Sequence, residues 1–296
     1  MSTTSTESAA PFAGPFAGSG ALITGGGSGI GFAAARLLAR DGAQVTLMGR
    51  TAEKLAAAAD ELAREFPGAP PATIAPGSVD DETAVAEAVR IATETTGRLA
   101  IAVASAGTGG VAPIVAQPLD EFQNIVSTNL TGTFLTIKHA GAAIVAGGGG
   151  SIVAVSSLAA CTVHAWMSAY AATKAGIDAL VRNAADELGP SGVRVNSVQP
   201  SLVDTELVAW PMADEPLVES YLVNMPVAHI GRPDEVAQVI RFLAGDESGW
   251  VTGNCLPVDG GHHLRRGPDY GSIAALLYGD DAVLPGFTGS TTDQAD

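Results

Sequence analysis

The chain has 296 residues, of which 47% are hydrophobic and 16% charged, and its formal net charge is -16. This composition is typical of a soluble globular enzyme rather than of a disordered chain. The excess of acidic residues would repel nucleic acid and anionic membranes, so we expect neither as a partner. The two cysteines, Cys161 and Cys255, lie far apart in the chain and in no zinc-like spacing. We therefore expect no disulfide framework and no metal site.

The N-terminal segment, residues 1–19, has neither the basic start nor the apolar run of a secretion signal. No later stretch reaches the uninterrupted apolar length of a transmembrane helix. We therefore expect a flexible leader on a cytoplasmic protein.

Between residues 20 and 263, short apolar runs alternate with longer amphipathic, Ala-rich segments. This alternation is typical of repeated βα units, and nearly continuous apolar strands indicate a sheet covered by helices on both faces. We expect one α/β domain with a Rossmann-like, doubly wound parallel sheet of about seven strands. The expected strands are Ala21–Thr24, Gln44–Met48, Ala72–Ala75, Leu99–Ala104, Ser151–Ser156, Arg194–Val198 and Cys255–Val258. The expected helices are Ile30–Arg40, Ala52–Glu65, Asp81–Thr95, Leu119–Val145, Ser168–Leu188 and Pro233–Ala244.

The first expected strand runs into the sequence TGGGSGIG, Thr24 to Gly31, and an Ala-rich helix follows. Glycines at such a turn let the backbone approach a pyrophosphate, and the free N–H groups of the helix start bind the anion. The spacing differs from the commoner G-x-G-x-x-G fingerprint. A flexible turn is the alternative, but the flanking strand and helix favour a dinucleotide site.

The second expected strand ends without the acidic residue that usually binds the ribose diol of NAD. Gly49 occupies that place and Arg50 follows it, offering donors suited to the 2′-phosphate of NADP. The alternative is a solvated arginine at the start of the next helix. We therefore favour NADP(H) as cofactor and keep NAD(H) open.

Ser157, Tyr170 and Lys174 form the constellation with the clearest chemical meaning. Tyr170 and Lys174 are four residues apart on an expected helix, so they share one of its faces. A surface contact is the alternative for such a pair. Here the pair follows a strand that ends at Ser156 and Ser157, where open α/β sheets bind their ligands.

Two C-terminal regions depart from the alternation. Residues 201–226 are long for a strand-to-helix loop, yet they contain Trp210, Tyr221 and other apolar side chains. We expect them to form a mobile lid over a largely apolar substrate. Residues 264–296 form a C-terminal extension, whose apolar stretch Ile273–Leu284 we expect to dock on its own or a neighbouring subunit.

In this order, the motifs TGGGSGIG, Ser105–Gly107, Asn129 in STNLTG, Ser157 and YAATK resemble those of the short-chain dehydrogenase/reductase (SDR) family. The resemblance extends from about Gly20 to Gly261 and includes the later stretches NSVQPSLVDTEL, GRPDEVAQVIRFLA and VTGNCLPVDGG. It implies an NAD(P)-dependent oxidoreductase that moves a hydride between nicotinamide and a secondary alcohol or ketone.

The resemblance also implies roles for individual residues. Tyr170 would be the general acid/base, and Lys174 would bind the nicotinamide ribose and lower the pKa of the phenol. Ser157 would orient the substrate oxygen, and Asn129 would support a water-mediated proton relay to Lys174. Strand-end capping and a helix-bend hydrogen bond are the structural alternatives for Ser157 and Asn129.

The resemblance also implies which residues form the cofactor site. It consists of Thr24, Gly25, Gly27, Ser28, Gly29, Ile30, Gly31, Arg50, Ser78, Val79, Ser105, Ala106, Gly107, Tyr170, Lys174, Pro200, Val203 and Thr205. The chain departs from the family at Ser78, Ser105 and Ser201, where the family commonly has Asp, Asn and Gly, which puts details of the cofactor contacts in doubt.

For the substrate we expect contacts from Ser157, His164, Trp166 and Trp210. The long segments Leu119–Val145 and Ser168–Leu188 resemble those by which family members pair, so we expect a homodimer or homotetramer.

Two alternatives compete with this function. A reductase of enoyl thioesters is the first, but such enzymes usually space tyrosine and lysine more widely than YAATK does. The second is a catalytically silent nucleotide-binding sensor or scaffold with the same fold. Such a protein would be expected to lose Ser157, Tyr170 or Lys174, and all three are present.

Overall fold

The computed structural model describes residues 14–209, 211–265, 267 and 270–279. It contains a seven-stranded parallel sheet with the strand order β3-β2-β1-β4-β5-β6-β7, which confirms the predicted α/β class. The strands are β1 (Gly20–Thr24), β2 (Gln44–Gly49), β3 (Thr73–Pro76), β4 (Leu99–Ala104), β5 (Gly150–Val155), β6 (Val193–Pro200) and β7 (Cys255–Val258). Most of the predicted leader, residues 1–13, lies outside the described residues.

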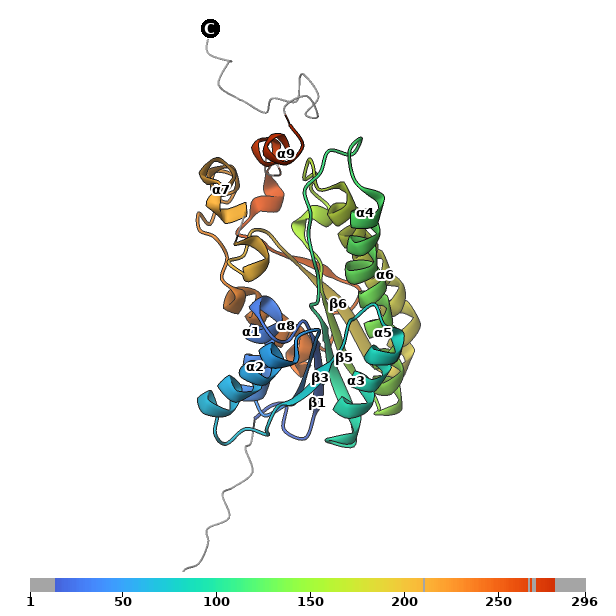
Figure 1. Cartoon of the computed structure of the whole chain (residues 1–296). Helices are drawn as coiled ribbons and strands as arrows, with labels where there is room; N and C mark the ends of the chain where they lie inside the picture. Colours follow the sequence, from blue (N-terminus) through green and yellow to red (C-terminus); the bar gives the residue numbers. More distant parts are fainter. Residues whose placement is uncertain (1–13, 210, 266, 268–269, 280–296) are drawn as a thin grey trace, which may run out of the picture.

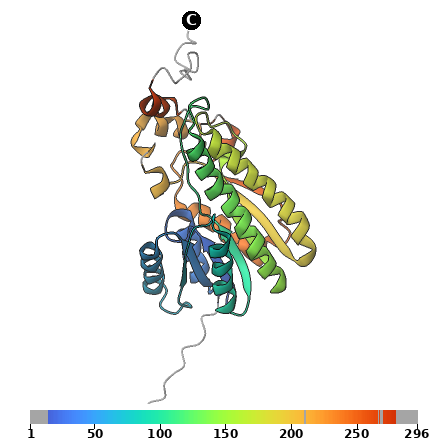
Figure 2. The same ribbon diagram turned by 45° about the vertical axis from the view of Figure 1, so that its right-hand side comes forward.

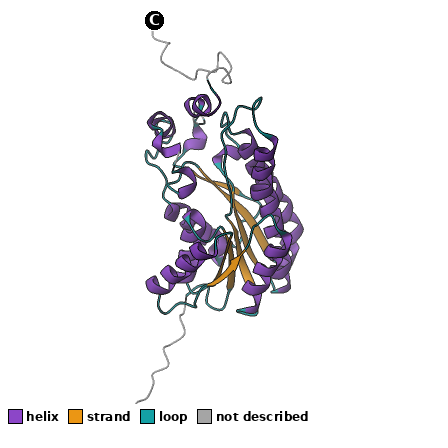
Figure 3. Cartoon of the chain, viewed as in Figure 1, coloured by secondary structure: helices purple, strands orange, loops and turns teal. Residues whose placement is uncertain are grey.

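Helices cover both faces of the sheet (Figure 1, Figure 3). On one face, Leu38, Leu62 and Ile240 pack in a core under α1, α2 and α8. On the other face, Val85, Ile144 and Ile177 pack in a second core under α3, α5 and α6. The helices are α1 (Gly29–Arg40), α2 (Ala52–Glu65), α3 (Glu82–Glu94), α4 (Leu119–Ile125), α5 (Gly132–Ala146), α6 (Ser168–Leu188), α7 (Glu215–Leu222), α8 (Pro233–Ala244) and α9 (Gly271–Tyr278).

The predicted helix Leu119–Val145 is interrupted. A π-helical turn, Val126–Thr131, separates α4 from α5, and it contains Asn129. Single π-helical turns inside helices frequently mark functional sites.

The region 201–226 contains a helix where the sequence predicted only a loop. Asp214 caps the start of α7, since its carboxylate accepts a hydrogen bond from the Leu217 amide at 3.4 Å. Figure 1 shows α7 and α9 together at one end of the molecule. A third buried cluster joins them, formed by Leu202, Leu217, Tyr221, Met225, Tyr270 and Ile273.

The chain crosses over between β1 and β4, which pair directly although two strands separate them in sequence. In open α/β sheets, ligands bind outside the carboxyl ends of the strands at such a switch point. None of the helices in the described part of the chain combines the length and the apolar character that a membrane crossing requires.

Candidate active site

The turn after β1 has room for backbone only. Gly25 and Gly29 have φ angles of +68° and +55°, a region that side chains disfavour. A Cβ atom on Gly31 would lie 2.3 Å from the Gly25 carbonyl oxygen. The glycines therefore form a cradle that added side chains would fill.

The start of α1 is open to an anion. Ser28 precedes this helix in an extended conformation, and its side chain makes no capping hydrogen bond. In contrast, Asp81 caps α3 by accepting hydrogen bonds from the amides of Thr83 and Ala84. Because the first amides of α1 lack a side-chain cap, they suit the pyrophosphate of a dinucleotide.

Thr24 supports this cradle from behind. Its hydroxyl oxygen accepts hydrogen bonds from the amides of Ser105 at 3.1 Å and Ala106 at 3.3 Å, and the residue is 1% exposed. Thr24 therefore ties the end of β1 to the end of β4. This positioning role is what the structure shows for Thr24, and its direct contact with the cofactor stays a prediction.

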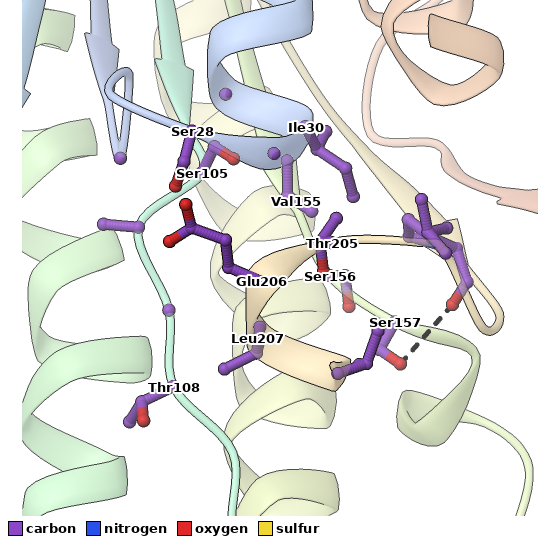
Figure 4. A pocket seen from close by; sticks show the side chains of 18 of the residues that line it. Ser28, Ile30, Ser105, Thr108, Val155, Ser156, Ser157, Thr205, Glu206 and Leu207 are labelled. Carbon is purple, nitrogen blue, oxygen red and sulfur yellow. Dashed lines mark hydrogen bonds between the residues drawn. The ribbon is translucent and has the colours of Figure 1, made fainter. Parts of the chain in front are cut away.

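Two adjoining pockets of about 200 and 360 Å³ follow the carboxyl ends of the strands and form one crevice, the predicted place of the cofactor. Apart from Thr24, every residue of the predicted cofactor site lines one or both of them. Figure 4 shows the part that runs from Ser28 to Ser157. Lys54, Thr128, Glu206 and Leu207 also line the crevice but were not among the predicted site residues. Thr128 lies in the motif STNLTG, and Glu206 and Leu207 lie in NSVQPSLVDTEL, whereas Lys54 lies outside the quoted motifs.

Lys174 lies behind Tyr170 on α6. Its ammonium donates a hydrogen bond to the Val155 carbonyl oxygen at 2.8 Å and lies 5.4 Å from the centre of the Tyr170 ring. Burial lowers the pKa of Lys174 to about 8, against the opposing effect of Asp178. The structure thus brings the predicted pair together at the crevice.

Ser157 follows the end of β5 beside Tyr170. Its hydroxyl accepts a hydrogen bond from the Ala159 amide at 3.1 Å and donates to the Pro200 carbonyl oxygen at 3.5 Å (Figure 4). Burial raises the pKa of Tyr170, and the Ser157 side chain opposes that rise. The lowering of this pKa by Lys174 stays a prediction.

Asn129 is fully buried in the π-helical turn. Its amide group donates to Thr108 O at 2.9 Å and to Thr173 Oγ1 at 3.1 Å, and its oxygen accepts from Thr108 N at 2.8 Å. A Cβ on Gly107 would lie 3.3 Å from Asn129 Oδ1 and 3.8 Å from Lys174 Nζ. Asn129 and Lys174 therefore converge behind Gly107, as a relay would require, and the relay itself stays a prediction.

A separate cavity of about 550 Å³ opens beside Tyr170 and Ser157. Its wall is mostly apolar, and it contains the predicted residue His164. Trp166, with a φ of +69°, instead packs against the third buried cluster. Trp210 lies outside the described residues. Among the residues that the structure describes, the lining consists of Gly109, Gly110, Val111, Glu121, Ser157, His164, Met167, Tyr170, Ser201, Leu202, Leu207, Val208, Tyr221, Tyr270, Leu277 and Tyr278.

Sequence reasoning missed the contribution of Tyr270, Leu277 and Tyr278 to this cavity. The only signal was the apolar character of the extension. It indicated that this segment packs against its own or a neighbouring subunit, but not that it lines the substrate cavity. Within the described ranges, no group of three or more His, Cys, Asp or Glu side chains could hold a metal ion.

Residues 25–263 match a family model described as "Enoyl-(Acyl carrier protein) reductase". The chain is 39% identical over 244 residues to a cis-4-hydroxycyclohexanecarboxylate dehydrogenase of Sinomonas cyclohexanicum, covering 82% of this chain and 95% of that protein. It is 35% identical over 242 residues to an L-rhamnose 1-dehydrogenase (NAD(P)(+)) of Azotobacter vinelandii, covering 81% and 94%. A short-chain type dehydrogenase/reductase from Mycobacterium ulcerans has a similar solved structure, with a TM-score of 0.87 and 40% identity over 90% of this chain and 98% of that chain.

The chain belongs to the short-chain dehydrogenase/reductase family. It is an NAD(P)-dependent oxidoreductase that transfers a hydride between a nicotinamide and a secondary alcohol or ketone. The glycine cradle and the open start of α1 fit this cofactor. The alternative of a catalytically silent sensor or scaffold finds no support among these relatives.

Proposed function

We propose that the protein interconverts a secondary alcohol and a ketone on an apolar, ring-containing substrate and uses NADP(H). The observation that carries this proposal is the mostly apolar cavity that opens directly on Tyr170 and Ser157. Its volume of about 550 Å³ lies within the range of about 300 to 1,000 Å³ that encloses drug-sized ligands.

The hydride would be exchanged with a bound nicotinamide. Tyr170 then exchanges a proton with the substrate oxygen, and Ser157 donates a hydrogen bond that orients the same oxygen. Lys174, which already lies behind the Tyr170 ring, binds the nicotinamide ribose. Asn129 holds the chain around Thr108 and connects Lys174 to a proton relay.

Two cations favour NADP(H). Arg50 and Lys54 both line the part of the crevice beside Gly49, where a carboxylate would otherwise select the ribose diol of NAD. A guanidinium and an ammonium at this place suit a 2′-phosphate.

We also propose a homodimer or homotetramer. The two long helical segments, α4 with α5 and α6, run side by side along one face of the molecule (Figure 2). Leu119, Phe122 and Phe134 are exposed there, the last by 46%. Light scattering at working concentration should then give a mass above that of one chain.

The cytoplasmic location of the protein and the mobility of residues 201–226 stay predictions.

The substrate class is tested by steady-state kinetics on a matched panel with both cofactors. Cyclohexanone, a two-ring ketone such as 2-decalone, and their alcohols represent the proposed class, and L-rhamnose and gluconate represent polar polyols. We expect turnover of the ring compounds with NADP(H) and little turnover of the polyols. Efficient turnover of the sugars and none of the ring compounds would overturn the proposal.

A further inference from the structure

The chain continues beyond the part that matches the family model, which ends at residue 263. Tyr270 and helix α9 follow, and they contribute Tyr270, Leu277 and Tyr278 to the wall of the substrate cavity. The Ser272 hydroxyl donates to the carboxylate of Asp214, the residue that caps α7, at 2.8 Å. Tyr270 and α9 are therefore part of the cavity wall, and Ser272 connects them to the start of α7, which forms another side of the cavity.

Two phenol groups meet where α7 and the extension pack. The hydroxyl oxygens of Tyr221 and Tyr270 are 2.8 Å apart, and each residue is 4% exposed. Both side chains line the cavity that contains Tyr170. A phenol has a single proton, so when one hydroxyl of the pair donates to the other, one O–H remains available.

This pair stays neutral near neutral pH. Burial raises the pKa of Tyr270 to about 12 and that of Tyr221 well above its ordinary value. The pair therefore offers the cavity one O–H donor and several oxygen lone pairs, but no charge. In an apolar cavity, a donor without an acceptor is costly, so a ligand oxygen placed there would gain a hydrogen bond.

The remaining polar groups of the cavity are unsuited to an anion. Among the described residues of its wall there is no Lys or Arg, whereas Glu121 contributes an exposed carboxylate. Burial lowers the pKa of His164 to about 4, so this imidazole is neutral at pH 7. Its Nδ1 lies 2.8 Å from the Thr162 carbonyl oxygen, which assigns the ring proton to Nδ1 and leaves Nε2 as an acceptor.

We propose that the Tyr221 and Tyr270 hydroxyls bind a second oxygen of a neutral substrate, away from the oxygen that reacts at Tyr170. This inference rests on the proposed function. It narrows the substrate class to neutral ring compounds with two oxygens, such as diketones, hydroxyketones and diols. The inference also predicts a different substrate from that of the relative named for a hydroxycyclohexanecarboxylate. A substrate carboxylate would lie near the like-charged Glu121, and no Lys or Arg is among the described residues of the cavity wall.

The test uses ketones that differ by one group. Cyclohexanone is compared with cyclohexane-1,4-dione and with 4-oxocyclohexanecarboxylate. 2-Decalone is compared with decalin-2,6-dione, so that the second oxygen is tested at two distances from the reacting carbonyl group. For the unmodified enzyme with saturating cofactor, we expect kcat/KM to be about three- to tenfold higher for a diketone than for its monoketone, as one added hydrogen bond allows. We expect the carboxylate to be the poorest of the one-ring substrates.

Tyr221→Phe and Tyr270→Phe retain the rings and remove one hydroxyl each. We expect both variants to lose the preference for the diketones, so that the ratio of kcat/KM for a diketone to kcat/KM for its monoketone falls by about three- to tenfold, the contribution of the lost hydrogen bond. Tyr278→Phe is the matched control, because it removes a phenol hydroxyl from the same cavity but outside the pair. It should retain the preference.

The outcomes separate the two proposals. If the enzyme reduces monoketones and diketones equally well, or if the Phe variants keep the preference, the inference about the tyrosine pair is wrong and the proposed function stands. A preference for the carboxylate would overturn the assignment of a neutral substrate. If no ring ketone is turned over while a sugar is, the proposed function itself fails, and the inference fails with it.

Discussion

The crevice for the cofactor and the cavity for the substrate meet at Tyr170 and Ser157, but the chain builds them differently. The crevice is lined mainly by residues that directly follow the ends of β1, β2, β3 and β4, among them several glycines. The cavity collects side chains from four distant segments, residues 109–121, 157–170, 201–221 and 270–278.

The two regions therefore differ in the substitutions that they can accommodate. In the crevice, glycine backbone forms much of the wall, and at Gly31 even one added carbon would collide with a carbonyl oxygen. In the cavity, apolar side chains form the wall, and exchanges that conserve their volume are usually tolerated. We therefore expect substitutions in the cavity wall to change the choice of substrate without loss of cofactor binding.

The largest expected effect tests the point where the two regions meet. Tyr170→Phe keeps the ring and removes the proposed proton donor. Single-turnover hydride transfer should fall by a factor of about 10² to 10⁴, the usual contribution of a positioned acid or base. The dissociation constant of the cofactor should change little. Near-normal hydride transfer would show that another group handles the proton.

The fold and the crevice were largely predictable because their signals are local. Periodic apolar runs placed all seven strands, and motifs at strand ends named the residues of the crevice. Thr24 shows the limit of such reasoning, since only the meeting of β1 with β4 reveals that its hydroxyl is engaged by Ser105 and Ala106.

For the substrate cavity, the sequence predicted the apolar character but not most of the residues that line it. The apolar residues of segment 201–226 indicated an apolar substrate, but the pairing of Tyr221 with Tyr270 spans 49 residues and depends on how α7 and α9 pack. Lys54 and Glu206 are a similar case, because an ion pair between residues 152 apart leaves no mark in either local sequence. Contacts of this kind are set by tertiary packing.

A second substitution should act on the crevice alone. A Cβ on Gly49 would lie 3.3 Å from the end of the Leu55 side chain, which can move aside, so Gly49→Asp should fold normally. Its carboxylate should repel the 2′-phosphate and accept from the ribose diol, shifting the NADP(H) to NAD(H) preference by about tenfold or more. Titration of both cofactors measures this shift.

Gly49→Asn is the matched control for size without charge, and it should shift the preference much less. With saturating cofactor, the Asp variant should keep its relative kcat/KM values across the ketone panel, because the cavity is untouched. Clearly tighter NAD(H) than NADP(H) binding by the unmodified enzyme would contradict the proposed cofactor preference.

The third prediction concerns pH. Burial disfavours the charged form of Lys174 and lowers its pKa from 10.5 to about 8, so in the free enzyme the ammonium is present below pH 8 and is lost above it. If the cofactor ribose binds the ammonium, the dissociation constant of the cofactor should rise above pH 8 by up to about tenfold per pH unit. Isothermal titration between pH 6 and 10 would follow it.

Lys174→Met removes the titrating group and keeps much of the side-chain length. Its cofactor affinity should be lower at pH 7 and should not show the step near pH 8. The partner groups Tyr170 and Asp178 remain in this variant, so a step that persists would assign the pH dependence to another group.

The smallest expected effect is also the one that tests whether the two regions are separate. Glu206 belongs to the segment 201–226 that forms one side of the cavity, yet its carboxylate lies in the crevice near Ser28 (Figure 4) and pairs with Lys54 at 2.6 Å. The pair is exposed, with side-chain exposures of 56% and 67%, so its removal should hardly change stability.

Glu206→Gln should instead release Lys54 and remove a negative charge from the part of the crevice where we expect the cofactor phosphates. We expect NADP(H) affinity to rise by about two- to fivefold, the scale of exposed charge interactions, and to rise less at high salt. Glu121→Gln removes a carboxylate from the cavity side and should leave the affinity unchanged. If both substitutions changed NADP(H) affinity equally, overall charge would explain the effect, and Glu206 would not link the substrate side to the cofactor.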